Sequence, residues 1–335
     1  MNIDPMNELI EPLITMVISL AALLASSEIA IKNAVKLSEA TGLGKSRIGF
    51  TFVATSTSLP ELAVALFSAT SGEAAVSIGN VLGSNIANIC LIIGLGLILY
   101  TLKRRSKKLN VIKFKPEELD TLYLGIFTAS IIPILLISFL PASRIVGLLL
   151  VSIYAYQTYK IITRRELQLE ESGEPVEAES KKRSLIVYTA MAFLGIIGVV
   201  VSADFLVDST VKIALLMGVS PYVISATIIA VGTSFPELSL DIQAMLKEHV
   251  SLAFGDVIGS CFTNITLILG ITLLLSPVRL NIKVFSDLVT FSILANILLW
   301  YLMHRGGLSW REGFYLLMLY SLFLSSIMGI LVFPE

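Results

Sequence analysis

Two glutamates, Glu61 and Glu237, each lie in a run of apolar residues within nearly the same short sequence. The first is part of ATSTSLPELA, residues 54 to 63, and the second of AVGTSFPELS, residues 230 to 239. An ionisable side chain at membrane depth costs about 2.5 to 3.5 kcal/mol on insertion scales. Two such residues at matching positions therefore indicate a function that offsets this cost, and binding a cation is such a function.

The residues before each glutamate add further oxygen atoms. Both copies read Thr-Ser-x-Pro-Glu, so hydroxyl groups and a helix-breaking proline stand beside each carboxylate. Proline removes an amide donor and frees an upstream carbonyl, and discontinuous helices in transporters use such carbonyls to coordinate ions. Hard cations such as Ca²⁺ and Na⁺ prefer oxygen ligands. The hydroxyl residues concerned are Thr57, Ser58, Thr233 and Ser234.

A second motif recurs at the same offset of 176 residues. GNVLGSNIANICLIIG, residues 79 to 94, reappears as GDVIGSCFTNITLILG, residues 255 to 270. Its polar residues are spaced four apart and so share one helix face, while glycines at the same spacing permit close helix approach. Packing and ion ligation both remain open for these positions. They are Asn80, Ser84 and Asn88 in the first copy, and Asp256, Ser260 and Asn264 in the second.

Composition places this chain of 335 residues among polytopic membrane proteins, with 55% hydrophobic and 15% charged residues and a mean hydropathy of +0.86. The sequence predicts an all-α protein with ten transmembrane helices, because about 20 apolar residues cross the hydrocarbon layer. The predicted windows are 8–30, 47–71, 76–100, 121–140, 143–162, 184–206, 219–246, 251–276, 284–304 and 309–332.

The loops predict the orientation of these helices. Those after the first, third, fifth, seventh and ninth helix hold 20 of the 24 basic residues, and positive loops stay cytoplasmic. Both termini are therefore expected to be extracellular, and two repeats of five helices must have inverted topology. The repeats are predicted at 1–162 and 184–335, joined by a charged cytoplasmic linker at 163–183. The two cysteines, Cys90 and Cys261, fall inside predicted helices and are expected to be packing residues.

The paired motifs TSLPE with GSNIAN, and TSFPE with GSCFTN, resemble the two alpha repeats of the Ca²⁺/cation antiporter superfamily, sodium/calcium exchanger branch. The resemblance covers both repeats in order and spacing. It implies secondary active antiport of Ca²⁺ against Na⁺ by alternating access, with the ions competing for a site near the membrane midplane.

The resemblance also implies ligands. In that family the two glutamates bind Ca²⁺ directly, which points to Glu61 and Glu237. Flanking Na⁺ sites use backbone and hydroxyl oxygens of the preceding segment. In this sequence those positions are Ala54, Thr57 and Ser58 in the first repeat, and Ala230, Thr233 and Ser234 in the second. Ser84 and Ser260 match the serines of the family's third and eighth helices.

The sequence departs from the sodium exchanger pattern at one position, because Asn88 and Asn264 are both amides where these exchangers often carry one aspartate. Proton-coupled relatives often have asparagine there, so exchange of Ca²⁺ for H⁺ stays open as an alternative. Asp256 stands where the first repeat has Asn80. It could assist ions on their way to the site, but capping of the eighth helix is the favoured reading.

Other classes fit less well. A cation channel could use paired glutamates, but channels usually build acidic rings from an oligomer, whereas an inverted duplication suits alternating access. No histidine or paired aspartate accompanies the glutamates, so the protein is not expected to be an enzyme. Neither a cofactor, a nucleic acid nor an obligate protein partner is inferred, and the expected surroundings are the lipid bilayer of a microbial cell membrane.

Overall fold

The computed structural model describes residues 5–41, 58–103, 112, 116–138, 143–169, 181–276, 282–305 and 307–329. These residues are helical throughout, apart from turns and a single antiparallel bridge between Ile112 and Leu308. The predicted all-α class is therefore confirmed for the part of the chain that is described. The outer and longer helices are α1 (Pro5–Thr41), α6 (Pro116–Ser138), α7 (Arg144–Leu169), α8 (Lys181–Met217), α14 (Ile282–His304) and α15 (Trp310–Ile327).

The inner helices are interrupted. Their segments are α3 (Leu59–Thr70), α4 (Ala74–Ile86), η1 (Ala87–Ile93), α5 (Gly94–Lys103), α9 (Pro221–Ile224), η2 (Ser225–Ile229), α10 (Ala230–Thr233), α11 (Phe235–Leu246), α12 (Val250–Thr263), η3 (Asn264–Ile268) and α13 (Leu269–Leu275). The η segments are π-helices, in which each amide bonds to the fifth residue before it, a feature frequent at functional sites. The sequence pattern did not predict them.

Five of the described helical segments are long and apolar enough to cross a membrane, and a sixth is formed if the bent pair Pro221–Thr233 and Phe235–Leu246 counts as one span. The five are Leu9–Ala30, Ala74–Lys103, Leu185–Met217, Val250–Leu275 and Phe285–His304. The chain is therefore a helical polytopic membrane protein. Each of the ten predicted windows overlaps helix in the described residues, although not every helix passes the test of length and hydropathy.

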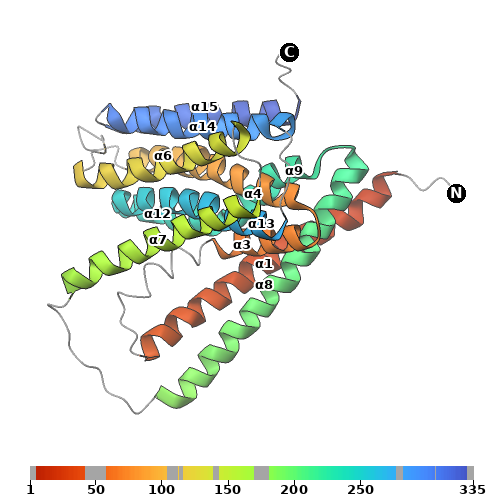
Figure 1. Cartoon of the computed structure of the whole chain (residues 1–335), viewed down its shortest axis with the longest axis horizontal. Helices are drawn as coiled ribbons and strands as arrows, with labels where there is room; N and C mark the ends of the chain where they lie inside the picture. Colours follow the sequence, from red (N-terminus) through yellow and green to blue (C-terminus); the bar gives the residue numbers. More distant parts are fainter. Residues whose placement is uncertain are drawn as a thin grey trace.

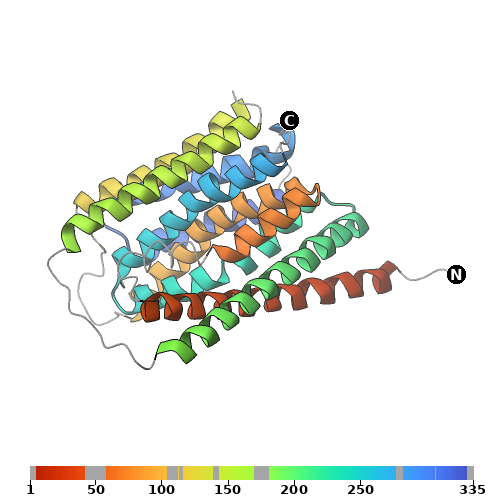
Figure 2. The ribbon, with the colours of Figure 1, turned by 60° about the horizontal axis from the view of Figure 1, so that its bottom comes forward.

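Most of the helices form one bundle, and α1 and α8 form a separate pair along its side (Figure 1). Figure 2 shows the same pair along the lower edge of the bundle, where the two helices cross each other. The largest apolar core joins the interrupted inner helices to α6, α14 and α15, and a smaller core joins α1 and α8 to α3. Only 22% of the apolar window is buried in α1 and in α8, whereas 83% is buried in Ala74–Lys103. The interrupted helices therefore form the interior, and α1 and α8 present apolar side chains outward.

Close helix contact at the first glycine pair is confirmed. A Cβ atom at Gly79 would lie 2.6 Å from the backbone oxygen of Tyr222, and one at Gly83 would collide with the backbone of Ala226. The absence of these side chains lets α4 lie directly against α9 and η2. For the second pair, Gly255 and Gly259, no described atom lies within 4 Å of such a Cβ.

The charged segment predicted between the repeats is described only at its two ends, residues 163–169 and 181–183. Helix α7 continues through Leu169 and α8 begins at Lys181, so both ends of residues 163–183 are helical. Cys90 and Cys261 are free and buried in the interior, in keeping with their expected role in packing.

Candidate cation site

Glu61 and Glu237 occupy the same place in two similar helix starts. Each lies in the first turn of its helix, α3 or α11, directly after the proline. The residues before these helices, Ser58 and Ser234, have nearly identical backbone angles, with φ/ψ of −84°/12° and −82°/10°. At Ser234 the helix bends by 47°, so the predicted break before the glutamate is confirmed in the second repeat.

Both carboxylates are withdrawn from the surface, since each glutamate is only 1% exposed. The Oε2 atom of each has no hydrogen-bond partner, and Ser234, three residues before Glu237, donates a hydrogen bond to Glu61. Their position at helix N-termini is favourable because the amide ends of a helix stabilise negative charge. A buried pair of like charges nevertheless requires a compensating cation or proton.

The two repeats contribute to each other's half of the site. Ser234 Oγ of the second repeat donates to Glu61 Oε1 of the first at 3.3 Å. Its neighbour Thr233 donates to Asn80 Oδ1 at 3.2 Å, and Ser84 Oγ donates to the Ala230 carbonyl at 3.4 Å. The broken segment before α11 therefore lies directly on the polar face of α4, as the spacing of that face predicted.

Asn85 links the two inner helices at the next position along α4. Its side-chain Nδ2 donates to the Cys261 carbonyl at 3.3 Å, and its Oδ1 accepts from Asn264 Nδ2 at 3.0 Å. Asn85 is completely buried. Sequence reasoning missed this residue because it does not belong to the series spaced by four, although it is a third buried amide in the same motif, beside Asn80 and Asn88.

Buried oxygen atoms without a protein partner gather on these same elements. On the predicted site residues they are Oγ of Ser58 and Ser260, Oε2 of Glu61 and Glu237, and Oδ1 of Asn88 and Asn264. Carboxylate, hydroxyl and amide oxygens are the donors that Ca²⁺ and Na⁺ take. Nowhere in the described ranges do three His, Cys, Asp or Glu side chains come close enough to share one metal ion. A cation held by these residues would therefore use two carboxylates with neutral oxygens around them.

The structure brings most of the predicted site residues together in the interior. Buried residues among them are Ser58, Glu61, Ser84, Asn88, Ala230, Thr233, Ser234, Glu237, Ser260 and Asn264. Ala54 and Thr57 lie outside the described residues, so their predicted part in a sodium site stays a prediction.

The expectation that Asp256 caps the eighth helix is wrong. Helix α12 begins at Val250, its N-terminal flanking residue is His249, and Asp256 lies well inside the helix. The apolar stretch extends further toward the preceding turn than the motif suggested, so the helix starts before the aspartate. Asp241 of α11 is a further buried acid in this region that the sequence reasoning did not select.

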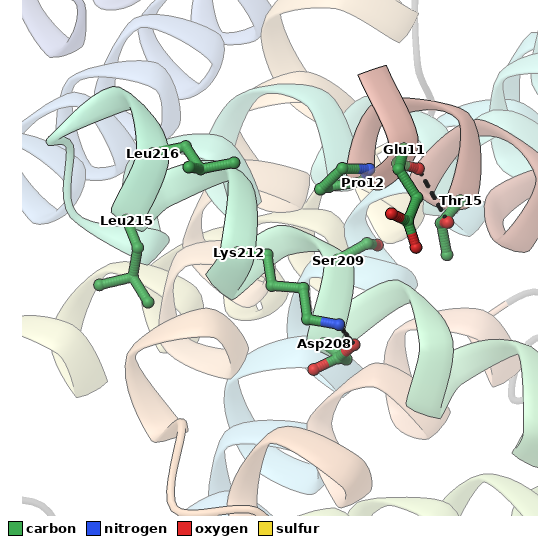
Figure 3. A pocket seen from close by; sticks show the side chains of 8 residues that line it. All are labelled: Glu11, Pro12, Thr15, Asp208, Ser209, Lys212, Leu215 and Leu216. Carbon is green, nitrogen blue, oxygen red and sulfur yellow. Dashed lines mark hydrogen bonds and ion pairs between the residues drawn. The ribbon is translucent and has the colours of Figure 1, made fainter. Parts of the chain in front are cut away.

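A surface pocket of about 360 Å³ lies elsewhere, between α1 and α8 (Figure 3). It contains an ion pair of 2.7 Å between Lys212 and Asp208, whose side chains are 59% and 57% exposed. Exposed pairs of this kind contribute little energy. None of the predicted site residues lines this pocket, so it is not the cation site.

Comparison with known proteins agrees with this architecture. The sequence profile described as "Sodium/calcium exchanger protein" matches residues 11–163 and 187–329. The chain is 29% identical to the sodium/calcium exchanger MaX1 of Methanosarcina acetivorans, over 92% of this chain and 96% of that protein. It is 30% identical to the putative antiporter CaxA of Alkalimonas amylolytica, over 79% of this chain and 81% of that protein.

Two solved structures share the fold. The sodium-calcium exchanger NCX_Mj, soaked with 10 mM Na⁺ and no Ca²⁺, matches with a TM-score of 0.61 at 24% identity over 95% of this chain and 99% of the other. The H⁺/Ca²⁺ exchanger CAX matches with a TM-score of 0.73 at 18% identity, over 97% and 82% of the two chains. Since the family profile covers most of the sequence in two segments, one for each copy of the motifs, this chain belongs to the sodium/calcium exchanger protein family.

Proposed function

We propose that this protein is a secondary active antiporter that exchanges Ca²⁺ for Na⁺ across a membrane. One observation carries the proposal: two buried glutamates from equivalent helix starts, Glu61 and Glu237, lie together with unpartnered oxygens beside a broken helix. Membership of the sodium/calcium exchanger family and the similarity to MaX1 over nearly the whole chain support the same ions.

Charge suggests how the ions exclude one another. The two glutamates supply a charge of about −2 when ionised, which one Ca²⁺ or two Na⁺ would neutralise. Asn88 and Asn264 add oxygens without adding charge. Ca²⁺ and Na⁺ would therefore compete for the same carboxylates, and any third Na⁺ would occupy a less charged position formed by hydroxyl and carbonyl oxygens. Such competition couples the movement of one ion to that of the other.

The two inverted repeats would let the ion site open alternately to the two sides of the membrane. In this proposal the protein has ten transmembrane helices as two inverted repeats of five, with both termini extracellular and residues 163–183 on the cytoplasmic side of a microbial membrane. The contacts from Ser234 to Glu61 and from Thr233 to Asn80 join one repeat to the other. A movement of one repeat against the other would break these contacts and could open the site to the opposite side.

Exchange of Ca²⁺ for H⁺ is the second candidate, because the central amides Asn88 and Asn264 leave the site without a third acid. The fold is shared with the H⁺/Ca²⁺ exchanger CAX as well. Buried carboxylates also bind protons readily, so protons would compete with Ca²⁺ at the same glutamates.

The test is ⁴⁵Ca²⁺ uptake into proteoliposomes that contain the full chain. Vesicles are loaded with Na⁺, with an acidic Na⁺-free buffer, or with neither, and the external solution is the same in all three. Uptake that requires internal Na⁺ supports the proposal. Uptake driven only by internal protons supports the second candidate, and uptake that needs neither gradient would overturn both in favour of a channel.

A further inference from the structure

The second repeat carries two acids that the first repeat lacks. With the offset of 176 residues, Asp241 corresponds to Ala65 and Asp256 corresponds to Asn80. The glutamates and the serines of the two repeats match, so the difference in charge between the corresponding helices is confined to these two positions. Acidic charge at these positions is therefore present only in the second repeat, on one side of the pseudo-symmetric site.

The two aspartates lie at one level between neighbouring helices. Asp241 is one turn after Glu237 on α11, and Asp256 is on α12, which packs against α11 after a short turn at Lys247–His249. Asp241 stands six residues before that turn and Asp256 seven residues after it, so an antiparallel pair brings them opposite each other.

Asp241 is a buried acid whose carboxylate has no partner in the described part of the protein. It is 0% exposed, and neither of its carboxylate oxygens has a hydrogen-bond partner. Asp256 is partly exposed and has its Oδ2 atom buried without a partner. A buried carboxylate is costly unless it is paired or coordinates a metal. Among the described residues, neither an ion pair nor a hydrogen bond compensates the carboxylate of Asp241.

This pair is separate from the glutamate pair. No three acidic side chains among the described residues approach closely enough to hold one metal ion together, so Glu237 cannot complete a site with both aspartates in this conformation. The aspartates lie between the glutamates and the α11–α12 turn, where the partial exposure of Asp256 leaves room for an ion to keep some of its water. Ca²⁺ commonly combines carboxylates with water in its coordination shell.

We propose that Asp241 and Asp256 bind a second Ca²⁺, next to the transport site on the side of the α11–α12 turn. Two carboxylates neutralise one divalent cation, and the ion they hold lies one helical turn from Glu237. The choice of Ca²⁺ rests on the proposed function, whereas the existence of the site rests on the aspartates alone. Because the first repeat has Ala65 and Asn80 at the corresponding positions, only one side of the transport site has this additional ion.

The experiment is equilibrium binding of ⁴⁵Ca²⁺ to the purified full chain in detergent without Na⁺. Two Ca²⁺ per chain are expected for the wild type. The double variant Asp241→Ala/Asp256→Asn, which gives the second repeat the residues of the first, is expected to bind one. Glu61→Gln is expected to lose the ion at the glutamates and keep the other. Equal numbers of Ca²⁺ bound by the wild type and the double variant would overturn the proposal, whereas one in the wild type and none in the double variant would leave the aspartate site standing and count against Ca²⁺ binding at the glutamates.

Two further variants of this chain serve as controls for the binding experiment. Asp241→Asn keeps the size of the side chain, so it should bind one Ca²⁺ even if the double variant is unstable, and elution as a single folded species verifies it. Asp208→Asn removes an exposed acid on α8 and should still bind two. If the wild type takes up no ⁴⁵Ca²⁺ in exchange for Na⁺ or H⁺ while Glu61→Gln still binds one Ca²⁺, the antiport function is refuted and the aspartate site stands.

Discussion

Asn85 and Cys261 occupy the same position in the two repeats and hydrogen bond to each other in both directions. Asn85 Nδ2 donates to the Cys261 carbonyl at 3.3 Å, and Cys261 Sγ donates to the Asn85 carbonyl at 3.9 Å. Residues that meet their own counterparts reciprocally mark a two-fold axis. The axis that relates the repeats therefore passes between α4 and α12, beside the candidate cation site.

Replacing Asn85 tests this central contact. Asn85→Ala removes the bond to the Cys261 carbonyl and leaves Asn264 Nδ2 without its acceptor. Loss of buried hydrogen bonds of this kind costs about 1 to 3 kcal/mol, so a lower thermal unfolding temperature in detergent is expected. The control Cys261→Ala loses only a weak thiol bond and should change that temperature less. Equal stability of Asn85→Ala and the wild type would contradict the role given to Asn85.

The glutamates are tested by Glu61→Gln and Glu237→Gln, each of which removes one charge and keeps the shape of the side chain. Initial rates of Na⁺-driven ⁴⁵Ca²⁺ uptake should fall more than about tenfold, because a loss of only 1.4 kcal/mol in ion binding has that effect. Glu28→Gln, an exposed site on α1, serves as the control and should transport normally. If both buried variants exchange Ca²⁺ at the wild-type rate, the glutamates are not ligands.

The amides can be converted to acids one at a time. Asn88 Oδ1 has no partner, so Asn88→Asp adds charge without breaking a bond to that atom, and Na⁺ should support half-maximal uptake at a lower concentration. Asn264→Asp should shift the Na⁺ dependence in the same direction. It also places a carboxylate against Asn85 Oδ1, which now accepts from Asn264 Nδ2.

Asn264→Asp should therefore unfold at a lower temperature than Asn88→Asp in Na⁺-free buffer, and added Na⁺ should narrow the difference because ligand binding stabilises the folded state. Uptake and unfolding are measured in parallel, with choline replacing Na⁺ in the reference samples. An unchanged Na⁺ dependence in both variants would mean that charge at these positions does not set sodium affinity.

The close contact of α4 can be probed with a single methyl group. In Gly79→Ala the new Cβ meets the backbone of Tyr222, which cannot move aside cheaply, and overpacking of this kind costs about 1 to 3 kcal/mol. In the control Gly96→Ala the new Cβ meets the flexible end of Met245, so a smaller effect is expected. Thermal unfolding of the two variants should differ, and equal unfolding temperatures would show that α4 can shift.

The strongest sequence signals predicted the elements around the site. The repeated motifs identified Glu61 and Glu237, and Pro236 correctly predicted a broken helix because proline cannot donate the bond that an uninterrupted helix needs. The four-residue spacing predicted that Asn80 and Ser84 share a face, and both contact the segment before α11. These features depend on local backbone geometry, which can be predicted from residue type and from spacing along the helix.

Contacts between the two repeats could not be predicted from the spacing of residues in the sequence. The bond from Ser234 to Glu61 joins residues far apart in the chain, and no spacing within either motif specifies it. Asp256 was wrongly assigned as a cap because the capping preference of aspartate was considered apart from the apolar window at 251–276, which already placed the helix start before it. Asp241 has no counterpart in the first repeat, so a comparison of repeats alone passed over it.

The π-helical segments Ala87–Ile93 and Asn264–Ile268 give the motifs a constraint on length. An α-helix turns by about 100° for each residue. Deleting one residue after the amide in either segment could restore regular α-helical bonding, but it would rotate everything beyond the deletion by about that angle relative to the serine and the amide before it. The number of residues between Ser84 and Gly94, and between Ser260 and Gly270, is therefore as much a part of this protein's design as the identity of the polar side chains.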